Sequence, residues 1–184
     1  MCAQSAPHIH HHGVFMDVLG SGVLLTGTTN IGKSELALEL ITRGHSLIAD
    51  DAPEFTLSSP DKIIGRSPDI LREFLEVRGL GILNVRAMFG DNAVKHHKTL
   101  NLIIHLTQFE HANEITMDRL HGTVHTQEIL DQKVDTIDLP VALGRNLAVL
   151  VETAVRNYNL KLKGYNSVDE FIKRQRSFME PDSE

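Results

Sequence analysis

The feature that most constrains the fold of this chain is an eight-residue loop at 27–34 (GTTNIGKS), which fits the pattern G-x-x-x-x-G-K-[ST]. It follows residues 22–26 (GVLLT), a short and nearly continuous apolar run that predicts a buried strand. It precedes residues 35–43, which are rich in helix formers and place Leu36 and Leu40 on one helical face. A strand, a loop and a helix in this order are the context that a phosphate-binding loop requires.

The residue types in the loop suit phosphate binding. Small residues, and residues that tolerate positive φ, let backbone N–H groups turn inward around phosphate oxygens, and the start of a helix adds partial positive charge. Asn30 stands where glycine is common, but asparagine is among the better non-glycine residues at positive φ. Lys33 brings a full charge to the outer phosphates, and the Ser34 hydroxyl can join a Mg²⁺ shell. The alternative is a turn that matches the pattern by chance. The context favours nucleotide phosphate binding by Gly27, Thr28, Thr29, Asn30, Ile31, Gly32, Lys33 and Ser34.

The composition narrows the class of protein. With 184 residues and 41% hydrophobic content, the chain is long enough for one domain with a sizeable core. A net charge of -6 and the lack of a Lys/Arg run argue against nucleic-acid binding. No stretch approaches the roughly 18 apolar residues of a membrane span. The single cysteine, Cys2, excludes an internal disulfide framework and suits a reducing cytoplasm.

The 11 histidines do not form an evident metal-binding pattern. His10, His11 and His12 form a run that we interpret as a solvated terminal segment or a cloning remnant. His121 and His125 are four residues apart, but no obvious third ligand is nearby. We therefore expect no structural zinc site.

Periodicity predicts more strands than helices. Residues 99–106 give the clearest strand pattern, with Leu100, Leu102, Ile104 and Leu106 expected on one face. Gly44 supplies a helix stop after residue 43. Many strands lie too close together for a purely alternating arrangement, so we expect an α/β fold of mixed, twisted sheets with C-terminal helices. The other expected elements are strands at 13–19, 45–49, 74–77, 81–84 and 134–139, a hairpin of 55–57 with 62–65, and helices at 145–160 and 168–178.

Asp50 and Asp51 follow the expected strand at 45–49, at the strand end where α/β sheets place ligand chemistry. A carboxylate there can reach a metal ion or an attacking hydroxyl. Two adjacent carboxylates repel each other, which can raise the proton affinity of one of them. The alternative is a polar turn after a strand. Beside a phosphate loop, we favour the functional interpretation.

Further candidates are less specific. Glu76 and Arg78 alternate with apolar residues, so they point to the same side and can present a metal-binding carboxylate beside a phosphate-binding guanidinium. A surface ion pair of little consequence is the alternative. Arg145 precedes the expected helix at 145–160 and is open to two interpretations, a phosphate or substrate ligand and an exposed helix-start arginine. The local sequence does not decide the roles of Arg119 and His12.

Taken together, these stretches resemble the C-terminal catalytic domain of the HPr kinase/phosphorylase family, bacterial protein-serine kinases unrelated to the eukaryotic kinases. The resemblance runs from residue 12 to about residue 178, and its ADD and LEVRGLGILNV segments are more specific than the phosphate loop. The matching segments are 12–14 (HGV), 31–35 (IGKSE), 43–51 (RGHSLIADD), 75–85 (LEVRGLGILNV), 88–90 (MFG), 118–120 (DRL) and 140–146 (PVALGRN).

The resemblance implies a P-loop fold of the phosphoenolpyruvate carboxykinase-like type over residues 12–180, after a flexible lead-in at 1–11. It implies a cytoplasmic homohexamer that uses ATP and Mg²⁺ and regulates carbon metabolism. Two opposed reactions are implied: phosphorylation of a serine in the phosphocarrier protein HPr, and removal of that phosphate by inorganic phosphate to give pyrophosphate. The alternatives are a small-molecule or carboxykinase-like phosphotransferase, and a nucleotide-binding regulatory module without turnover.

Matching positions carry the family's roles onto this chain. Asp51 is implied as general base in phosphorylation and general acid in the reverse reaction, with Asp50 in support. Lys33 is implied to bind the β- and γ-phosphates. Ser34 and Glu76 are the implied Mg²⁺ ligands, His12 and Arg119 match active-site positions, and Arg145 lies in the segment tied to dephosphorylation.

The chain departs from the family pattern in two places. The family loop usually begins Gly-Asp-Ser-Gly, whereas this one begins Gly27-Thr28-Thr29-Asn30, so a carboxylate is lost at Thr28. We expect the phosphate cradle to survive this change. The family also normally carries an additional N-terminal domain, and we interpret the chain as a truncated or naturally short form without it.

Overall fold

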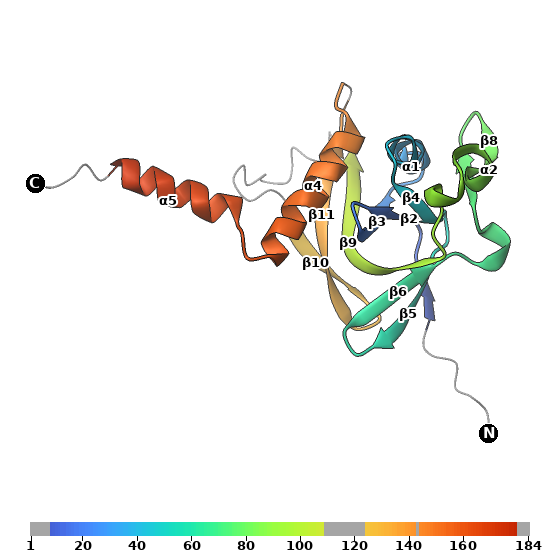
Figure 1. Cartoon of the computed structure of the whole chain (residues 1–184), viewed down its shortest axis with the longest axis horizontal. Helices are drawn as coiled ribbons and strands as arrows, with labels where there is room; N and C mark the ends of the chain where they lie inside the picture. Colours follow the sequence, from blue (N-terminus) through green and yellow to red (C-terminus); the bar gives the residue numbers. More distant parts are fainter. Residues whose placement is uncertain (1–7, 109–123, 143, 180–184) are drawn as a thin grey trace, which may run out of the picture.

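The structure, a computed structural model, describes residues 8–108, 124–142 and 144–179. These residues form a bent nine-stranded sheet, a separate two-stranded sheet and several helices (Figure 1). The strands are β1 (His8–His10), β2 (Val14–Val18), β3 (Ser21–Gly27), β4 (Ser46–Ala49), β5 (Glu54–Ser59), β6 (Lys62–Arg66), β7 (Phe74–Val77), β8 (Gly81–Asn84), β9 (His97–Gln108), β10 (Val124–Ile129) and β11 (Gln132–Val141). The helices are α1 (Lys33–Thr42), α2 (Val85–Phe89), α4 (Leu147–Leu162) and α5 (Ser167–Met179), with 3₁₀ turns η1 (Asp69–Leu71) and η2 (Asp91–Ala93).

The order of the strands brings particular chain ends to one edge of the large sheet. The order is β1-β5-β6-β9-β3-β2-β4, with β11 beside β9 and β10 beside β11. Strand β2 runs antiparallel to both of its neighbours, β3 and β4, so β3 and β4 run in the same direction. Their C-terminal ends therefore meet the start of β2 at a single edge. This mixed α/β architecture was expected from the sequence.

Two hydrophobic cores lie on opposite faces of this sheet. The first core contains Leu102, Ile104 and Leu106 of β9, and the second core contains Ile103 of the same strand. The alternation predicted for β9 is therefore correct over most of its length. It is wrong for Leu100, which packs in the second core, because the register against β3 shifts between Gly22 and Val23.

Helices α1 and α4 both pack into the first core. Leu36 and Leu40 of α1 are buried there, as their spacing predicts, beside Val151 and Val155 of α4. Helix α1 ends where expected, because Gly44 adopts a φ of 94° and the chain reverses into β4. The core thus holds α1 and α4 on one face of the sheet.

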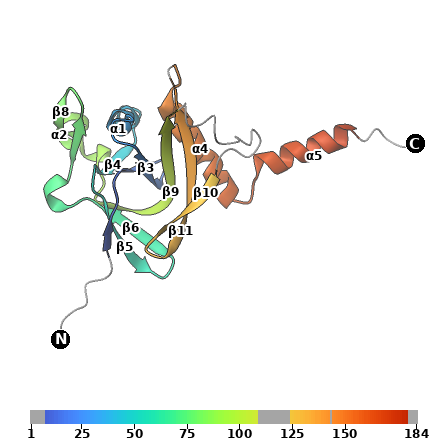
Figure 2. The same cartoon turned by 180° about the vertical axis from the view of Figure 1, so that it is seen from behind.

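Three parts of the chain differ from the expectation. Residues 8–10, expected within a flexible lead-in, form β1 and pair with β5. Strand β10 and helix α2 were not expected at all. Helix α5 has no buried residue and extends away from the body in two opposite views (Figures 1 and 2). Among the described residues, no helix is both long and apolar enough to span a membrane.

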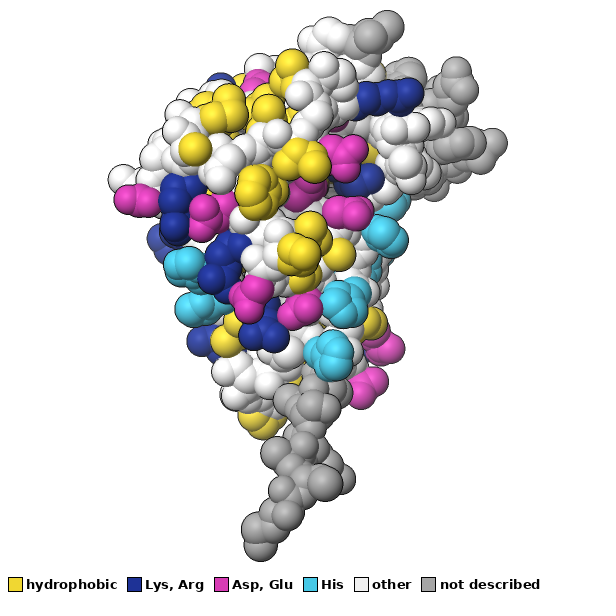
Figure 3. All heavy atoms as spheres, turned by 90° about the vertical axis from the view of Figure 1, so that its right-hand side faces the viewer, with side chains coloured by type: hydrophobic (Ala, Val, Ile, Leu, Met, Phe, Trp, Pro, Cys, Tyr) yellow, Lys and Arg dark blue, Asp and Glu magenta, His cyan; other side chains and the backbone are white. Residues whose placement is uncertain are grey.

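Exposed hydrophobic side chains gather on the side of the molecule that carries the β7–β8 hairpin and α2 (Figure 3). Ile82 is 73% exposed and pairs across the hairpin with Glu76. The exposed apolar residues of this side are Ile70, Leu71, Phe74, Leu80, Ile82, Met88 and Phe89.

Candidate active site

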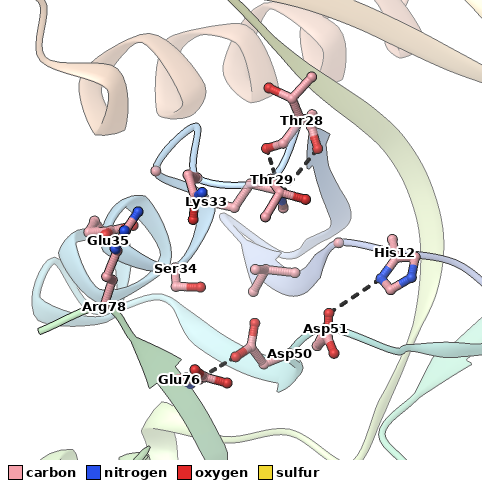
Figure 4. A pocket seen from close by; sticks show the side chains of 15 residues that line it. His12, Thr28, Thr29, Lys33, Ser34, Glu35, Asp50, Asp51, Glu76 and Arg78 are labelled. Carbon is pink, nitrogen blue, oxygen red and sulfur yellow. Dashed lines mark hydrogen bonds and ion pairs between the residues drawn. The ribbon is translucent and has the colours of Figure 1, made fainter. Parts of the chain in front are cut away.

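One cavity of about 450 Å³ lies at the sheet edge where β3 and β4 end (Figure 4). It brings together segments that are far apart in the sequence: the loop after β3, the acidic pair after β4, the residues before β2, and the β7–β8 turn. Its lining residues are His12, Gly13, Val14, Gly27, Thr28, Thr29, Asn30, Gly32, Lys33, Ser34, Glu35, Asp50, Asp51, Glu76 and Arg78.

The loop owes its shape to residues with positive φ. Gly27 has a φ of 140°, and a Cβ at this position would lie 2.7 Å from the carbonyl oxygen of Leu106. Asn30 has a φ of 66°, which confirms the expectation for this position. Gly32, with a φ of 100°, is the N-cap residue before α1, and no side chain of the described residues caps the helix there. The N–H groups of the first turn are therefore available to an anion.

Lys33 lies over the loop that precedes it. Its Nζ donates hydrogen bonds to the carbonyl oxygens of Gly27 and Thr28, both at 3.1 Å. Ser34 lines the cavity beside it, whereas Ile31 packs against the first core. An ammonium group held by neutral carbonyls can turn to a phosphate at little cost, because an ion pair replaces weaker neutral contacts.

The two adjacent aspartates have different environments. Asp50 is 8% exposed, and its Oδ2 accepts a hydrogen bond from the backbone N–H of Glu76 at 2.8 Å. Burial raises the pKa of Asp50, and the charges of Asp51 and Glu76 raise it further. Asp51 has a φ of 64°, and its side chain is 77% exposed. The pair therefore offers one buried and one accessible carboxyl group.

His12 joins the acidic pair from the segment before β2. Its Nδ1 lies 3.3 Å from Oδ1 of Asp51 (Figure 4), although the two residues are 39 positions apart. Gly13 fixes this approach, because a Cβ there would lie 2.4 Å from the carbonyl oxygen of Leu25. The His12 side chain is 91% exposed, so the contact sits at the mouth of the cavity.

Glu76 and Arg78 both line the cavity, as their alternation predicts. Glu35 lines it too, although it was not among the predicted site residues. The sequence feature that indicates this position is that Glu35 directly follows the Lys-Ser pair, in the first turn of α1. Hydroxyl and carboxylate oxygens from Ser34 and Glu76, with Asp50 nearby, are the kind of donors that Mg²⁺ prefers.

Of the two remaining candidate arginines, only Arg145 is described, and it is not among the cavity-lining residues. Arg145 lies just before α4, where its backbone N–H donates to the carbonyl oxygen of Ala142 at 3.3 Å. Arg119 falls outside the described residues, as does His121. His125 contacts Asp138 at 3.5 Å. Within the described ranges, no group of three His, Cys, Asp or Glu side chains is arranged to hold a metal ion.

Comparisons with known proteins agree on one family. The model of the HPr serine kinase C-terminal domain matches residues 3–175. The HPr kinase/phosphorylase of Chromobacterium violaceum is 55% identical over 168 residues, covering 91% of this chain and 53% of the relative. That of Nitrosomonas europaea is 51% identical over 174 residues, covering 95% of this chain and 54% of the relative. The chain thus spans about half the length of these relatives.

A solved structure shows the same fold. The Hpr(Ser) kinase/phosphatase from Coxiella burnetii is 38% identical and superposes with a TM-score of 0.80, covering 89% of this chain and 98% of that one. The family match covers most of the sequence, and the cavity holds the segments on which the resemblance depended. The chain therefore belongs to the family of HPr serine kinase C-terminal domains.

Proposed function

We propose that this chain is a nucleotide-dependent protein-serine kinase that also removes the phosphate by phosphorolysis, acting on the phosphocarrier protein HPr. The observation that carries the proposal is the single cavity that joins the Lys33 loop to the Asp51 carboxylate. A phosphoryl group held at the loop and a hydroxyl held at Asp51 would meet there. The names of the relatives support HPr as the acceptor.

The fold supports a P-loop domain of the phosphoenolpyruvate carboxykinase-like type. The phosphate loop connects β3 to α1 within a mixed sheet, where β2 runs antiparallel between β3 and β4. A homohexamer in the cytoplasm is the assembly and location that we propose from the family resemblance.

Asp51 is the proposed general base and acid. In the forward direction its carboxylate takes the proton of the serine hydroxyl while the serine oxygen attacks the γ-phosphorus of ATP and ADP leaves. In reverse, an oxygen of inorganic phosphate attacks the phosphoserine phosphorus to give pyrophosphate, and the leaving serine oxygen recovers the proton from Asp51. One carboxyl group can take both roles, because the bond to the serine oxygen is made in one reaction and broken in the other, with inorganic phosphate in place of ADP as the acceptor. His12, 3.3 Å away, orients the exposed carboxylate.

The buried partner Asp50 supports this arrangement. It holds the backbone of Glu76 by a 2.8 Å hydrogen bond and so ties the β7 strand to the end of β4. That bond keeps two acidic segments at the cavity although their charges repel.

The groups that bind the nucleotide phosphates are proposed to line the same cavity. Lys33 and the backbone of residues 27–34 would hold the ATP phosphates, and Ser34 with Glu76 would hold Mg²⁺. When bound, Mg²⁺ neutralises charge on the phosphate oxygens. Few protein ligands suffice, because Mg²⁺ in such sites also binds substrate phosphates. We propose Arg145 as a phosphate ligand that serves phosphorolysis, and Arg119, outside the described residues, as an active-site residue on the family resemblance alone.

The surface around the cavity favours a protein acceptor over a small molecule. Asp51 and His12 are 77% and 91% exposed, so a hydroxyl on another folded protein can reach them. Ile82, which pairs with the cavity residue Glu76, belongs to an exposed apolar side that a partner protein can bury.

Transfer of labelled γ-phosphate from ATP to HPr tests the proposal, together with release of pyrophosphate from phosphorylated HPr on addition of phosphate. Asp51→Asn should abolish both reactions, while Asp61→Asn, in the exposed β5–β6 turn, should abolish neither. If HPr is never labelled but a small acceptor is, the chain is a small-molecule phosphotransferase. If the wild type binds ATP and transfers nothing, it is a regulatory module.

A further inference from the structure

Away from the cavity, Glu152 of α4 binds two side chains from the turn between α1 and β4. Arg43 donates from Nε to Oε1 at 2.9 Å and from Nη2 to Oε2 at 2.6 Å. The Nε2 atom of His45 lies 2.8 Å from the same Oε1. The His45 and Glu152 side chains are only 8% and 16% exposed. The hydrogen bond from Arg43 lowers the pKa of Glu152 to about 2, so the carboxylate is charged at neutral pH.

The turn that Glu152 binds connects the two halves of the proposed site. Arg43 and His45 flank Gly44, where the chain leaves α1 and enters β4. Helix α1 begins at Lys33, inside the phosphate loop at 27–34, and β4 ends directly before Asp50. A shift of this turn would therefore displace both the phosphate loop and the acidic pair.

Apolar side chains of α1 and α4 also pack together. Leu36 and Leu40 of α1 pack with Ala148, Val151 and Val155 of α4 in the first core. The hydrophobic driving force is not directional, so burial of these side chains defines the position of α4 less sharply than a directional polar contact does. A two-bond guanidinium–carboxylate pair does fix such a position, because its geometry is planar and matched.

Helix α4 leads back to the other part of the proposed site. Arg145 lies just before its first turn, seven residues ahead of Glu152, or about 10 Å along the helix axis at 1.5 Å per residue. Asn146 caps the helix by accepting a hydrogen bond from the N–H of Val149 at 2.9 Å. The start of α4 is therefore fixed at Asn146, directly after Arg145.

We propose that Glu152 is a positioning residue: by fixing α4 on the α1–β4 turn, it sets where the Arg145 segment lies relative to the phosphate loop and Asp51. This inference rests on the proposed function, and in particular on the role of Arg145 in phosphorolysis. Relaxing the position of α4 should then harm phosphorolysis more than phosphorylation.

The test compares both reactions in Glu152→Gln and Arg43→Met, each also combined with Arg145→Ala. We expect the ratio of phosphorolysis to kinase kcat/KM to fall about tenfold in Glu152→Gln. It should fall less in Arg43→Met, which leaves the His45 contact in place. In the Arg145→Ala background, Glu152→Gln should lower the ratio no further, because both changes act through the same segment. The matched control is Glu170→Gln, which breaks an exposed ion pair with Arg174 on α5 and should leave the ratio unchanged.

Several results would overturn the inference. If both reactions lose activity equally, and in proportion to the fraction of unfolded protein, Glu152 is only a stabilising contact. A full additional fall in the Arg145→Ala background, or an Arg145→Ala variant with an unchanged ratio, would also refute it. If Glu152→Gln does not fold, Arg43→Met decides alone, since its exposed side chain can be replaced without opening the core. A wild type inactive in both directions refutes the proposed function instead.

Discussion

The two neighbouring aspartates at the candidate site differ in solvent exposure and in their hydrogen-bond partners. Asp50 and Asp51 are adjacent, yet the first is buried and bonded to the Glu76 backbone while the second is exposed beside His12. Asp51 also adopts a positive φ of 64°, an uncommon backbone conformation for a residue other than glycine. The buried carboxyl group can therefore serve structure while the exposed one remains free for proton transfer.

Lys33→Ala should nearly abolish both proposed reactions. The substitution removes the only full positive charge of the loop at 27–34, and loss of a preorganised group at a phosphoryl-transfer site costs about 100- to 1,000-fold in rate. Phosphotransfer to HPr and pyrophosphate release measure the two directions. Lys161→Ala, at the exposed end of α4, is the matched control. Retention of more than a tenth of the rate in either direction would contradict the role.

Asp50→Asn should stabilise the folded chain at neutral pH. The folded state raises the pKa of Asp50 above its ordinary value of 3.8 because it buries the carboxyl group. The folded state thus binds this proton more tightly, and the associated stability is fully present below pH 3.8 and is lost as the pH rises through the folded pKa. Asparagine avoids the burial of charge and still accepts the bond from Glu76.

Urea unfolding at several pH values measures this effect. The variant should exceed the wild type at pH 7, and the difference should shrink on acidification and vanish below about pH 3.8. A variant that is less stable than the wild type at neutral pH would show that the charge of Asp50 is compensated by its surroundings.

Among the elements, those with a strong local signal were predictable. Strand β9 alternates, α1 follows a motif, and β7 and β8 matched the expected bounds. Strand β1 was missed because it is exposed at every position and is held by pairing with β5, which leaves no pattern in the sequence. Strand β10 is mostly exposed and polar, and α2 has only five residues, too few to show a helical period.

The residues of the candidate site also differ in whether the sequence could predict them. The phosphate loop and the acidic pair are local motifs, so the sequence identified both as candidates. Contacts over long separations are different. The His12–Asp51 contact spans 39 positions and the Arg43–Glu152 pair spans 109, and neither follows from periodicity. The antiparallel strand β2 between β3 and β4 brings the first pair together, and the packing of α1 and α4 in the first core brings the second pair together.

Asn146→Ala should destabilise α4 and with it the chain. Asn146 is the N-cap of α4, and its side chain accepts a 2.9 Å hydrogen bond from the N–H of Val149. Replacing such a cap by alanine costs about 1 kcal/mol. Urea unfolding measures the loss, and Asn146→Asp, which keeps an acceptor at the cap, should restore most of it. Equal stability of the alanine variant and the wild type would mean that solvent or the preceding segment caps the helix as well.

At the scale of the whole molecule, two cores share one set of strands. Strands β2, β3 and β9 each send alternate side chains into the first and second cores. A face of the sheet cannot lose its packing without exposing the strands that support the other face. We therefore infer that the two cores form one cooperative unit.

A pair of substitutions, one in each core, tests whether the two cores unfold as one cooperative unit. Leu40→Ala removes a fully buried side chain of α1 from the first core and should cost about 2–5 kcal/mol. Ile48→Val trims β4 in the second core and should cost about 0.5–1.5 kcal/mol. Each variant should unfold in urea in one transition that is the same by far-UV and near-UV signals, and the double variant should show the sum of the two losses. Two separated transitions, or a loss confined to one signal, would mean that the cores melt independently.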